Sequence, residues 1–517
     1  MSPPWWRGAV LYQVYVRSFA DGNGDGVGDL DGVRAHLDDL VELGVDALWL
    51  CPPYPSPRVD GGYDVSDYQD IAPEYGGLAA FDRLVADAHA RGLRVLLDWV
   101  PNHTSDRHPW FVEAASGRDA ARRAWYVWRD GGGREQPPNP WLAAWGGTAW
   151  TWHEESAQWF LASFTPHQPE LDWRNPEVVA AMRDVLRFWL DRGVDGFRVD
   201  VVHMLGKDPD RGDLPAGAPL PMVHHDDAVH AVVRGLRAAL AERSPDLLLL
   251  GEVSIMDTAV VARYLDGGEG LHLAFDFCPM LAPWDAAAWW RCLADVHTHI
   301  GAAGGWPTWT FANHDNPRAT TRYGSSRRAR AVAAALLTLR GTPVIYAGEE
   351  LGLADASVPA HLVEDRAGRD GCRAPIPWHA TDGHGWGRSP WMAHPPDASR
   401  LAHGVQRTDP GSTWTLHRDL LALRRATPAL STGQMRLLAP ADGVVGWTRG
   451  AEEWLVVVGF RAGCLTARPD GRWTVVIDSG DRAGEGRVWD GLVTADTTLV
   501  LRRCSETPDG ASIEFPP

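Results

Sequence analysis

The sequence predicts an α/β protein built on a (β/α)8 TIM barrel, with a domain inserted after the third strand and an antiparallel β domain at the C-terminus. Three observations predict this fold. Short β-rich runs alternate with amphipathic stretches over most of the chain, a long excursion follows the third run, and alternating β runs take over after about residue 430. An open, doubly wound sheet is the structural alternative, but no G-x-G-x-x-G motif follows the first run.

Eight β-rich runs carry the barrel prediction, each short enough for a buried strand of a parallel sheet. In chain order they are Val10–Phe19, Ala47–Leu50, Arg94–Val100, Gly196–Val202, Leu247–Val253, His272–Phe277, Thr308–Asn313 and Pro343–Ala347. The stretches between them carry helix signals. Leu30–Leu43 stops at Gly44, and Pro176–Arg192 begins with proline and stops at Gly193. Eight such units suit a closed barrel, whose active site lies at the C-terminal ends of the strands.

Two departures from this repeating pattern give the domain boundaries. About seventy residues rich in Trp, Gly and Pro separate the third strand from its helix, and a connection of that length is usually functional or a small inserted domain. Beyond Leu430, runs such as Gly446–Arg449, Glu453–Phe460 and Trp473–Asp478 suit an antiparallel β domain. We expect a catalytic barrel over residues 1–103 and 176–430, an inserted domain over 104–175 and a C-terminal β-sandwich over 431–517.

The composition excludes several classes of function. The net charge of −18 argues against nucleic-acid binding and would not repel a neutral substrate. The 27 Trp residues agree with sugar binding and equally with core packing. The six cysteines lie far apart without a C-x-x-C pair, which argues against a disulfide scaffold or zinc cluster. Because no secretory run and no stretch of ~20 apolar residues occurs, we expect a soluble cytoplasmic protein without membrane partners; the sequence predicts no oligomeric state.

Acidic residues stand at the ends of three of the predicted strands. Asp200 ends the fourth, Glu252 the fifth and Asp315 the seventh. Glycoside hydrolysis needs such a set, because one carboxylate attacks the anomeric carbon and another, kept protonated, donates to the leaving oxygen. A single acid at a strand end is more often a helix cap or the partner of a barrel arginine. Three together at one end of a barrel predict a glycosidase active site.

Four segments carry a resemblance to a known family. They are DWVPNH at Asp98–His103, GFRVD at Gly196–Asp200, GEV at Gly251–Val253 and FANHD at Phe311–Asp315. In this order they resemble the conserved regions of glycoside hydrolase family 13, the α-amylase superfamily, and the resemblance covers nearly the whole chain. Members of that family are similar in having a domain inserted after the third barrel strand and a β-sandwich at the C-terminus.

The resemblance implies a role for each acid. Asp200 would be the nucleophile and Glu252 the general acid/base. Asp315 would hold sugar hydroxyls and stabilise the oxocarbenium-like transition state. A covalent glycosyl–enzyme intermediate, with the two reacting carboxyls close together, implies that the configuration of the sugar is retained.

Three further residues are implied beside these acids. Arg198 would lie next to Asp200 and keep it ionised, a charge effect that lowers a carboxylate pKa. His103 and His314 would donate hydrogen bonds to the sugar in the first subsite. A histidine at a strand end is more often structural, but each of these adjoins one of the family motifs.

Two loops resemble those that bind terminal glucose in α-glucosidases of this family. In Gly62–Tyr68, Tyr63 would stack on the non-reducing glucose and Asp64 would bind its hydroxyls. In Gly368–Pro375, Arg373 would pair with Asp64 and close that end of the pocket. A closed end implies exo-action on short α-glucosides, with little attack on starch. The alternative is an ordinary surface salt bridge, which is worth little.

Linkage preference stays open on the sequence alone. The segment His167–Trp173 is similar to the motif of the oligo-1,6-glucosidase side of the family, with Glu-Leu-Asp where the usual form has Asp-Leu-Asn. Val201, directly after the predicted nucleophile, resembles the residue of members that favour α-1,6 linkages. A β-branched residue also suits any strand end.

A glycine-rich loop after the first strand has the spacing of a cation site, because hard cations such as Ca2+ prefer oxygen ligands. Its oxygen-bearing residues are Asp21, Asn23, Asp25, Val27 through its carbonyl, and Asp29. The loop resembles the metal loop of oligo-1,6-glucosidases, although Gly32 stands where an EF-hand loop has glutamate. We expect a structural Ca2+ or Mg2+ here and no cofactor for catalysis. The alternative is a turn in which Asp29 caps the next helix.

The sequence therefore predicts a retaining exo-acting α-glucosidase that hydrolyses terminal α-linked glucose from short oligosaccharides or disaccharides. Its nearest rival is an α-glucosyltransferase or sugar isomerase on the same scaffold, because both reactions pass through the same intermediate. The Trp-rich insert and residues 348–391 would form the acceptor site that decides between them. A non-catalytic binding subunit is the rival of another class, but such relatives typically lack one of the acids, and this chain has all three.

Overall fold

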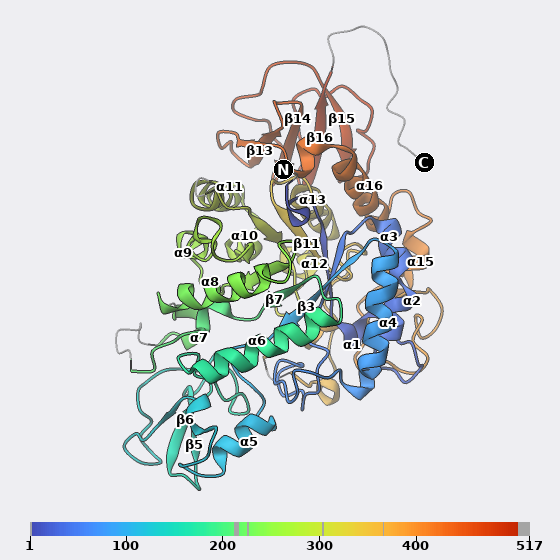
Figure 1. The fold of residues 1–517 in the computed structure, drawn as a ribbon. Helices are drawn as coiled ribbons and strands as arrows, with labels where there is room; N and C mark the ends of the chain where they lie inside the picture. Colours follow the sequence, from blue (N-terminus) through green and yellow to red (C-terminus); the bar gives the residue numbers. More distant parts are fainter. Residues whose placement is uncertain (1–2, 211–216, 225–226, 302–303, 366, 505–517) are drawn as a thin grey trace.

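At the centre of the molecule is a closed barrel of eight parallel strands (Figure 1). The computed structural model describes residues 3–210, 217–224, 227–301, 304–365 and 367–504. Around the barrel the strand order is β1-β11-β10-β9-β8-β7-β3-β2. The strands are β1 (Leu11–Val14), β2 (Ala47–Leu50), β3 (Arg94–Trp99), β7 (Gly196–Val199), β8 (Leu248–Glu252), β9 (Leu273–Phe275), β10 (Thr308–Thr310) and β11 (Thr342–Tyr346). The predicted barrel is confirmed.

Helices follow the barrel strands and cover the outside of the barrel (Figure 1). The α-helices of the barrel region are α1 (Val16–Phe19), α2 (Leu30–Ala35), α3 (Leu37–Leu43), α4 (Gly77–Ala90), α6 (Pro176–Asp191), α7 (Leu220–Val223), α8 (Ala228–Ala241), α9 (Thr258–Arg263), α10 (Cys278–Leu281), α11 (Ala286–Val296), α12 (Ala319–Tyr323), α13 (Ser326–Leu336), α14 (Ala398–Leu401), α15 (His403–Gln406), α16 (Thr413–Ala426) and α17 (Pro428–Ser431). Short helical turns are η1 (Trp5–Arg7), η2 (Pro73–Tyr75), η4 (Val202–Met204), η5 (Asp266–Gly268), η6 (His297–Gly301), η7 (Ala360–Leu362) and η8 (Asp370–Arg373).

The inserted domain lies between β3 and α6. It contains α5 (Pro109–Ala115), η3 (Arg123–Trp125) and an antiparallel sheet in the order β4-β6-β5, with β4 at Trp128–Arg129, β5 at Trp150–His153 and β6 at Gln158–Leu161. Six of its tryptophans pack in three pairs. The rings of Trp141 and Trp150, for example, stack with their centroids 6.2 Å apart. The predicted insertion after the third strand is therefore confirmed, and in Figure 1 it projects below the barrel.

The C-terminal region contains a five-stranded antiparallel sheet in the order β12-β13-β14-β16-β15. The strands are β12 (Met435–Leu437), β13 (Val444–Arg449), β14 (Trp454–Gly459), β15 (Trp473–Asp478) and β16 (Thr497–Arg503). One face packs against the barrel, where the Thr498 hydroxyl donates to the carbonyl of Ala331 in α13 at 2.8 Å. The antiparallel domain is confirmed. A sandwich of two sheets was predicted over residues 431–517, whereas the five strands named here form one sheet. Residues 505–517 of that range lie outside the described part.

Two predicted elements end or break earlier than expected. The first strand was expected to reach Phe19, but β1 ends at Val14 and Val16–Phe19 form α1. A short β-rich run does not distinguish a buried strand from a buried helical turn, and all four residues of α1, including Arg17 and Ser18, are buried. The helix expected over Leu30–Leu43 is divided at His36 into α2 and α3. It ends as predicted at Gly44, whose φ of 100° favours glycine.

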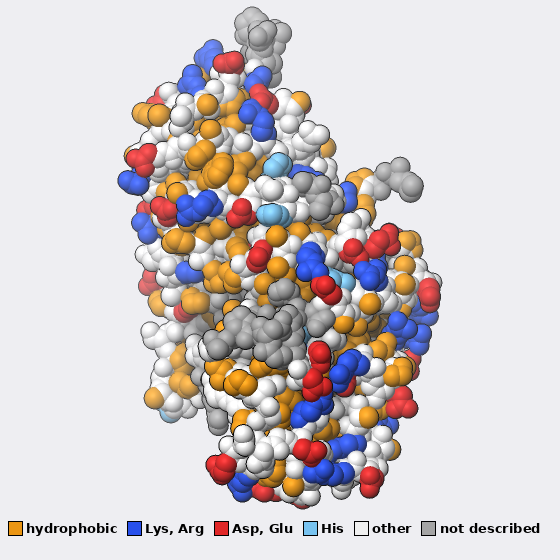
Figure 2. Space-filling view, turned by 90° about the vertical axis from the view of Figure 1, so that its left-hand side faces the viewer, with side chains coloured by type: hydrophobic (Ala, Val, Ile, Leu, Met, Phe, Trp, Pro, Cys, Tyr) orange, Lys and Arg blue, Asp and Glu red, His pale blue; other side chains and the backbone are white. Residues whose placement is uncertain are grey.

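The core has two main layers. Inside the barrel, side chains such as Leu11, Trp49, Leu250 and Phe275 fill the centre, while a larger cluster joins the outer strand faces to the helices. All six cysteines are free. Of the described helices, none is long and apolar enough to cross a membrane. Basic and acidic side chains are interspersed over the face in Figure 2.

Candidate active site

The strand register brings the predicted catalytic acids to one end of the barrel. Asp98 in β3 is the register partner of Arg198 in β7, and Arg198 is the partner of Leu250 in β8. Residues two apart on a strand face the same side. Asp200 and Glu252, each two positions further along, therefore face the same inner space as Arg198.

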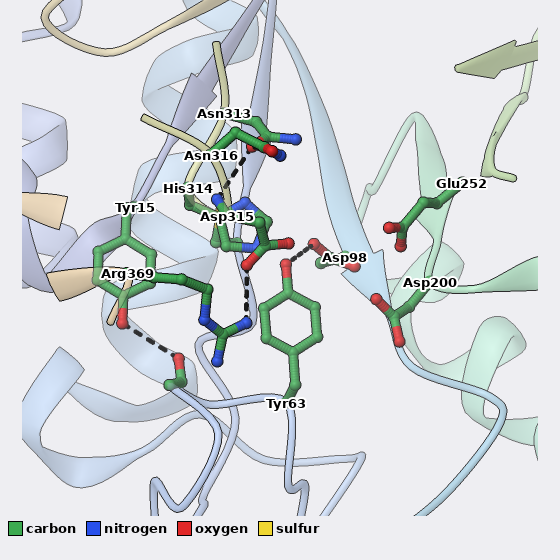
Figure 3. Close-up of polar contacts among 12 residues, drawn as sticks. Tyr15, Tyr63, Asp98, Asp200, Glu252, Asn313, His314, Asp315, Asn316 and Arg369 are labelled. Carbon is green, nitrogen blue, oxygen red and sulfur yellow. Dashed lines mark hydrogen bonds and ion pairs between the residues drawn. The ribbon is translucent and has the colours of Figure 1, made fainter. Parts of the chain in front are cut away.

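Arg198 joins three carboxylates at the floor of the site. Its Nη1 donates to Asp98 Oδ1 at 2.8 Å and to Asp200 Oδ1 at 2.7 Å. Its Nη2 donates to Glu252 Oε2 at 2.5 Å. All four side chains are buried, and Figure 3 shows the carboxylates of Asp200 and Glu252 facing each other. One guanidinium thus holds the predicted nucleophile and the predicted acid/base together.

Burial and crowding of like charges raise the pKa of Asp98 and of Asp200. Burial is the largest effect on Asp200, and it raises the pKa well above the ordinary value, as do Glu252 and Asp98; Arg198 opposes them. Burial likewise raises the pKa of Asp98 to about 6 against the pull of Arg198. Arg198 does lower the pKa of Asp200, as predicted, but burial outweighs this charge effect, so the net shift is upward. Asp98 and Asp200, which share one cation, therefore hold a proton at higher pH than an isolated carboxyl would.

Asp315 has the opposite electrostatic surroundings. Burial would raise its pKa, but His314, Arg369 and Arg373 hold the pKa of Asp315 well below its ordinary range. Burial also lowers the pKa of His314 to about 3, so this histidine is neutral near pH 7. The two arginines, whose Nη atoms lie 2.9 and 3.0 Å from Asp315 Oδ1, therefore supply the positive charge that keeps Asp315 ionised.

The predicted pairing of Asp64 with Arg373 is wrong. Asp64 is fully buried inside its own loop, where its carboxylate accepts from the Ser56 hydroxyl at 2.8 Å and from the amides of Val59 and Asp60 at 2.9 and 3.1 Å. These bonds satisfy the carboxylate and leave it out of the pocket. Arg373 lies behind Asp315 and donates from Nε to the carbonyl of His314 at 2.8 Å. Neither side chain lines the cavity.

A different acid–arginine pair, Asp60 and Arg369, closes the pocket. Each member stands four residues earlier in its loop than the residue predicted from the sequence. Arg369 binds Asp60 through Nη2, and the same nitrogen lies 2.7 Å from Asp365. The ring of Trp145, from the inserted domain, lies 4.7 Å from the Arg369 guanidinium. Asp60 also accepts from Gln168 Nε2 at 2.9 Å. Figure 3 shows Arg369 reaching Asp315, on the side of the site opposite Asp200 and Glu252.

Tyr63 and the two predicted histidines lie along one wall. Tyr63 lines the cavity, donates to Asp98 Oδ2 at 2.9 Å and stacks on His314 with ring centroids 5.2 Å apart. His314 lies behind it, with Nδ1 2.7 Å from Gln13 Nε2 and Nε2 3.4 Å from Asp315. His103 lines the cavity, and burial lowers its pKa to about 4. Of the two histidines predicted to touch the sugar, only His103 reaches the cavity surface directly.

Val201 lines the cavity in an unusual backbone conformation. Its φ is 33° and its ψ 48°, a left-handed conformation that a β-branched residue adopts only at a cost. The strand predicted over Gly196–Val202 therefore ends earlier, at Val199. The turn directs the Val201 amide to Glu252 Oε2 at 3.2 Å. The strained backbone next to the predicted nucleophile thus supplies a hydrogen bond to the predicted acid/base, Glu252.

The cavity is open at one side. Its volume of about 260 Å³ is near the small end of the size range of ligand pockets. Polar side chains lie at its inner end, and among the buried or half-buried ones are Asp60, His103, Asp200, Glu252, Asn313, Asp315, Asn316 and Arg369. Apolar side chains lie nearer its mouth, among them Phe164, Pro221, Met222, Met256 and Leu281. The shape and the polarity suit a small neutral molecule with many hydroxyls at one end.

In the glycine-rich loop, the predicted metal-binding oxygens accept hydrogen bonds from backbone amides. Asp21 accepts from the amides three and five residues on, at 2.6 and 2.9 Å. Asn23 and Asp25 each accept from the amide two residues on, at 2.9 and 2.8 Å. Asp29 caps α2 at 2.6 Å, as the alternative reading predicted. Within the described residues, no group of three or more His, Cys, Asp or Glu side chains is placed to hold a metal ion.

Comparison with known proteins identifies the family. The family model "Alpha amylase, catalytic domain" matches residues 13–433. The chain belongs to the α-amylase family. A probable α-glucosidase of Rhizobium meliloti is 39% identical to this α-amylase-family enzyme over 482 residues, covering 86% of this chain and 87% of the relative. An oligo-1,6-glucosidase of Parageobacillus thermoglucosidasius is 33% identical over 518 residues, covering 89% and 91%.

Solved structures of this glycoside hydrolase family agree with the fold. The crystal structure of an α-glucosyl transfer enzyme superposes with a TM-score of 0.88 at 36% identity, covering 97% of this chain and 100% of the other. The family membership of this enzyme therefore rests on sequence and structure together.

Several residues of the site were missed by the sequence reasoning. Asp60 and Arg369 stand four positions before Asp64 and Arg373, which were predicted to close the pocket. The correct loops were therefore identified, but with the wrong residues. Gln168 lies within a segment that was identified, and its amide bridges His103 and Asp60 at 3.0 and 2.9 Å. The apolar residues at the pocket mouth carry no motif, and only the fold gathers them.

Proposed function

We propose that this enzyme is a retaining, exo-acting α-glucosidase that releases terminal α-linked glucose from short glucosides. In the first step, the Asp200 carboxylate attacks the anomeric carbon while Glu252 gives its proton to the leaving oxygen. A glucosyl ester on Asp200 and a free alcohol result. In the second step, Glu252 takes a proton from water, and this water displaces Asp200 with overall retention.

One observation carries this proposal above the others. Arg198 ties Asp200 and Glu252 to the floor of a cavity whose opposite side is occupied by Asp60, Arg369 and Asp315. Burial raises the pKa of Asp98 and of Asp200, whereas the arginines beside Asp315 keep that acid ionised. Separate electrostatic surroundings of this kind allow one carboxyl to donate a proton while others remain charged.

The inner end of the cavity supports exo-action. Asp60 and Arg369 form a nearly buried pair, and hydrogen-bonding groups beside it suit the hydroxyls of one terminal glucose. A chain extending beyond that glucose would have to displace this pair. We therefore expect short substrates to be preferred to starch.

The test is product analysis with maltose, isomaltose, sucrose and soluble starch, followed by chromatography and by NMR of the first anomer released. We expect α-glucose from at least one disaccharide, little attack on starch, and near-complete loss of activity in Asp200→Asn. Release of β-glucose, or unchanged activity in the variant, would exclude the proposed mechanism. The preferred disaccharide decides the linkage preference associated with Val201.

An α-glucosyltransferase or isomerase is the second candidate, supported by the 36% identity to an α-glucosyl transfer enzyme. Both reactions form the same intermediate on Asp200 and differ in whether water or another hydroxyl attacks it. New oligosaccharides or a rearranged disaccharide at the earliest times would favour this candidate. A non-catalytic role is disfavoured, because all three acids lie together in one cavity.

We also propose that the loop of Asp21, Asn23, Asp25, Val27 and Asp29 binds a structural Ca2+ or Mg2+. Alternate oxygen-bearing residues suit a hard cation, and Gly26, at the sixth position of the loop, has a φ of 93° as a sharp turn requires. The cation would stabilise the loop and take no part in catalysis. A rise in melting temperature on adding Ca2+ to the chelator-treated protein, lost in Asp21→Asn, is expected; equal melting temperatures would contradict this proposal.

A further inference from the structure

Exposed apolar side chains gather at the mouth of the active-site cavity. Ten large hydrophobic side chains are strongly exposed in the described part of the chain, and four of them line this cavity. They are Trp145, Met222, Met256 and Leu281, with exposed fractions of 47, 45, 43 and 44%. Scattered exposed hydrophobics are ordinary, but a group of them at one mouth indicates a binding surface.

Most of this apolar surface lies on one side of the cavity. Met222 belongs to α7, which follows β7, and Met256 follows β8. Phe277, Met280 and Leu281 lie at or in α10, which follows β9. These five residues, here called the apolar rim, all line the cavity. Because β7, β8 and β9 are neighbours in the barrel, the apolar rim flanks the end of β8, where Glu252 lies.

The glucose-binding groups come from the other side of the barrel. Asp60 follows β2, Asp315 follows β10 and Arg369 follows β11, which with β1 are neighbours around the barrel. Figure 3 shows Arg369 and Asp315 on one side of the site and Glu252 on the other. Glu252 protonates the leaving oxygen, so the leaving group must lie beside Glu252 and against the apolar rim.

The groups around Glu252 offer little to a second sugar. Of the cavity-lining residues that follow β8 and β9 in the described part, Ser254 has the one hydroxyl, and it already donates to Glu252 Oε1 at 3.0 Å. The hydroxyls of a leaving sugar would face methionine, leucine and phenylalanine side chains and lose their hydrogen bonds to water. An apolar leaving group loses nothing by the same burial.

Methionine makes the rim suited to an aromatic ring. Met222, Met256 and Met280 are three of only eight methionines in the chain. The thioether is flexible and polarisable, adapts to different shapes and makes favourable contacts with aromatic rings. We propose that the leaving-group side of this cavity binds an aromatic aglycone, so that aryl-bearing α-glucosides are preferred to α-linked disaccharides. This inference rests on the proposed α-glucosidase function.

The bond changes are those of the two-step reaction. The bond between the anomeric carbon and the aglycone oxygen breaks as the Asp200 ester forms, and the proton of Glu252 goes to the aglycone oxygen. The aromatic alcohol leaves the apolar rim, and water replaces it. Glu252 regains a proton from that water when the ester is cleaved, so the enzyme returns to its starting state without any further reactant.

The test compares kcat/KM for benzyl α-D-glucoside with that for methyl α-D-glucoside, with maltose as the disaccharide. Benzyl alcohol and methanol are alcohols of nearly equal acidity, so the ratio reports contacts of the ring rather than leaving-group chemistry. We expect a benzyl-to-methyl ratio of about 10 or more, since one or two additional apolar groups in a fitted pocket give this discrimination. The ratio is independent of the amount of active enzyme.

Substitutions in the apolar rim complete the test. Met222→Gln and Met256→Gln, singly and together, keep the length of the side chain and replace its sulfur with an amide; the double variant should lower the ratio several-fold. Leu492→Gln, at an exposed leucine outside the cavity, is the matched control and should leave the ratio unchanged. If the double variant does not fold, the single variants and the wild-type ratio still decide.

The outcomes separate this inference from the function on which it rests. A ratio near one in the wild type, or one unchanged in folded rim variants, overturns the aromatic-aglycone proposal while cleavage of maltose and methyl α-D-glucoside supports the α-glucosidase. Failure to release glucose from any of the three substrates overturns the proposed function itself. A kcat/KM for maltose above that for the benzyl glucoside also contradicts the aromatic preference.

Discussion

Lys207 Nζ lies 2.7 Å from Glu170 Oε2, and both side chains are almost completely buried. The ammonium also donates to Asn102 Oδ1 at 2.7 Å. Lys207 is the one lysine among the 49 Lys and Arg residues of the chain. It follows β7, whereas Glu170 belongs to the inserted domain and Asn102 precedes His103. The pair therefore fastens the inserted domain to the barrel directly behind the active-site cavity.

Removing the ammonium should destabilise the protein strongly. Burial would raise the pKa of Glu170, but Lys207 holds it below its ordinary value, so the carboxylate is ionised. In Lys207→Met this charge loses its partner, and we expect the free energy of unfolding in urea to fall by about 3–5 kcal/mol. Adding Glu170→Gln should restore part of the loss. The control is Arg461→Met, whose partner Asp442 is exposed; equal stabilities of Lys207→Met and the control would refute this expectation.

Substitutions in the Asp60–Arg369 pair should impair catalysis, whereas substitution of Asp64 should impair stability. Asp60→Asn and Arg369→Met each leave one member of a nearly buried pair alone beside the sugar. We expect kcat/KM for the preferred glucoside to fall by about 100-fold or more. Asp64→Asn should instead lower stability by about 1–3 kcal/mol, since its carboxylate organises only its own loop. A larger loss of kcat/KM in Asp64→Asn than in Asp60→Asn would contradict this account and would favour Asp64, the residue predicted from the sequence.

The choice of Asp64 and Arg373 could not be corrected from the sequence alone. Each loop contains two candidates four residues apart, so the pairs Asp60–Arg369 and Asp64–Arg373 have identical spacing. Which one reaches the pocket depends on how the loop folds, and the amides of Val59 and Asp60 turn Asp64 inward. Sequence periodicity does not contain that information.

The barrel and its acids were predictable for a physical reason. The eight strands are buried apolar runs, and the ends of parallel strands meet at one face, so Asp200, Glu252 and Asp315 had to be neighbours. The left-handed turn at Val201 and the apolar rim arise from tertiary contacts, and neither has a local signal. The roles of the acids, the domain boundaries and the cytoplasmic location stay predictions.

Substitution by glycine should destabilise the protein less at Val201 than at Val202. A left-handed conformation costs a non-glycine residue about 1–3 kcal/mol, which offsets the lost burial of the side chain in Val201→Gly. We expect its stability to change by less than about 1 kcal/mol. Val202→Gly, at a fully buried residue without positive φ, should cost about 2–4 kcal/mol. Thermal unfolding of the two variants checks this; equal losses would argue against strain at Val201.

Buried neutral histidines should make the fold sensitive to acid. Burial lowers the pKa of His103 and His417 to about 4 and that of His314 to about 3. The unfolded chain binds these protons below about pH 6.5, whereas the folded chain binds them only near the lowered pKa values. Stability therefore falls as the pH falls from 6.5 to about 4, and for His314 to about 3. Each group contributes up to about 3 kcal/mol to that fall.

His417, away from the cavity, allows this to be measured without touching the site. In His417→Gln the melting temperature should fall less between pH 7 and pH 4.5 than in the wild type. His361→Gln, at an exposed histidine, is the control and should keep the wild-type dependence. A steeper fall in His417→Gln would contradict the assigned direction of the pKa shift.

The role of Asp200 as nucleophile is tested most directly by trapping the intermediate. Glu252→Gln would be incubated with α-glucosyl fluoride, whose leaving group needs no acid, so the first step proceeds while the second lacks its base. The digested protein would be examined by mass spectrometry. The account predicts one glucosyl group covalently attached to Asp200. An adduct on another residue, or steady fluoride release with β-glucose as first product and no adduct, would contradict it.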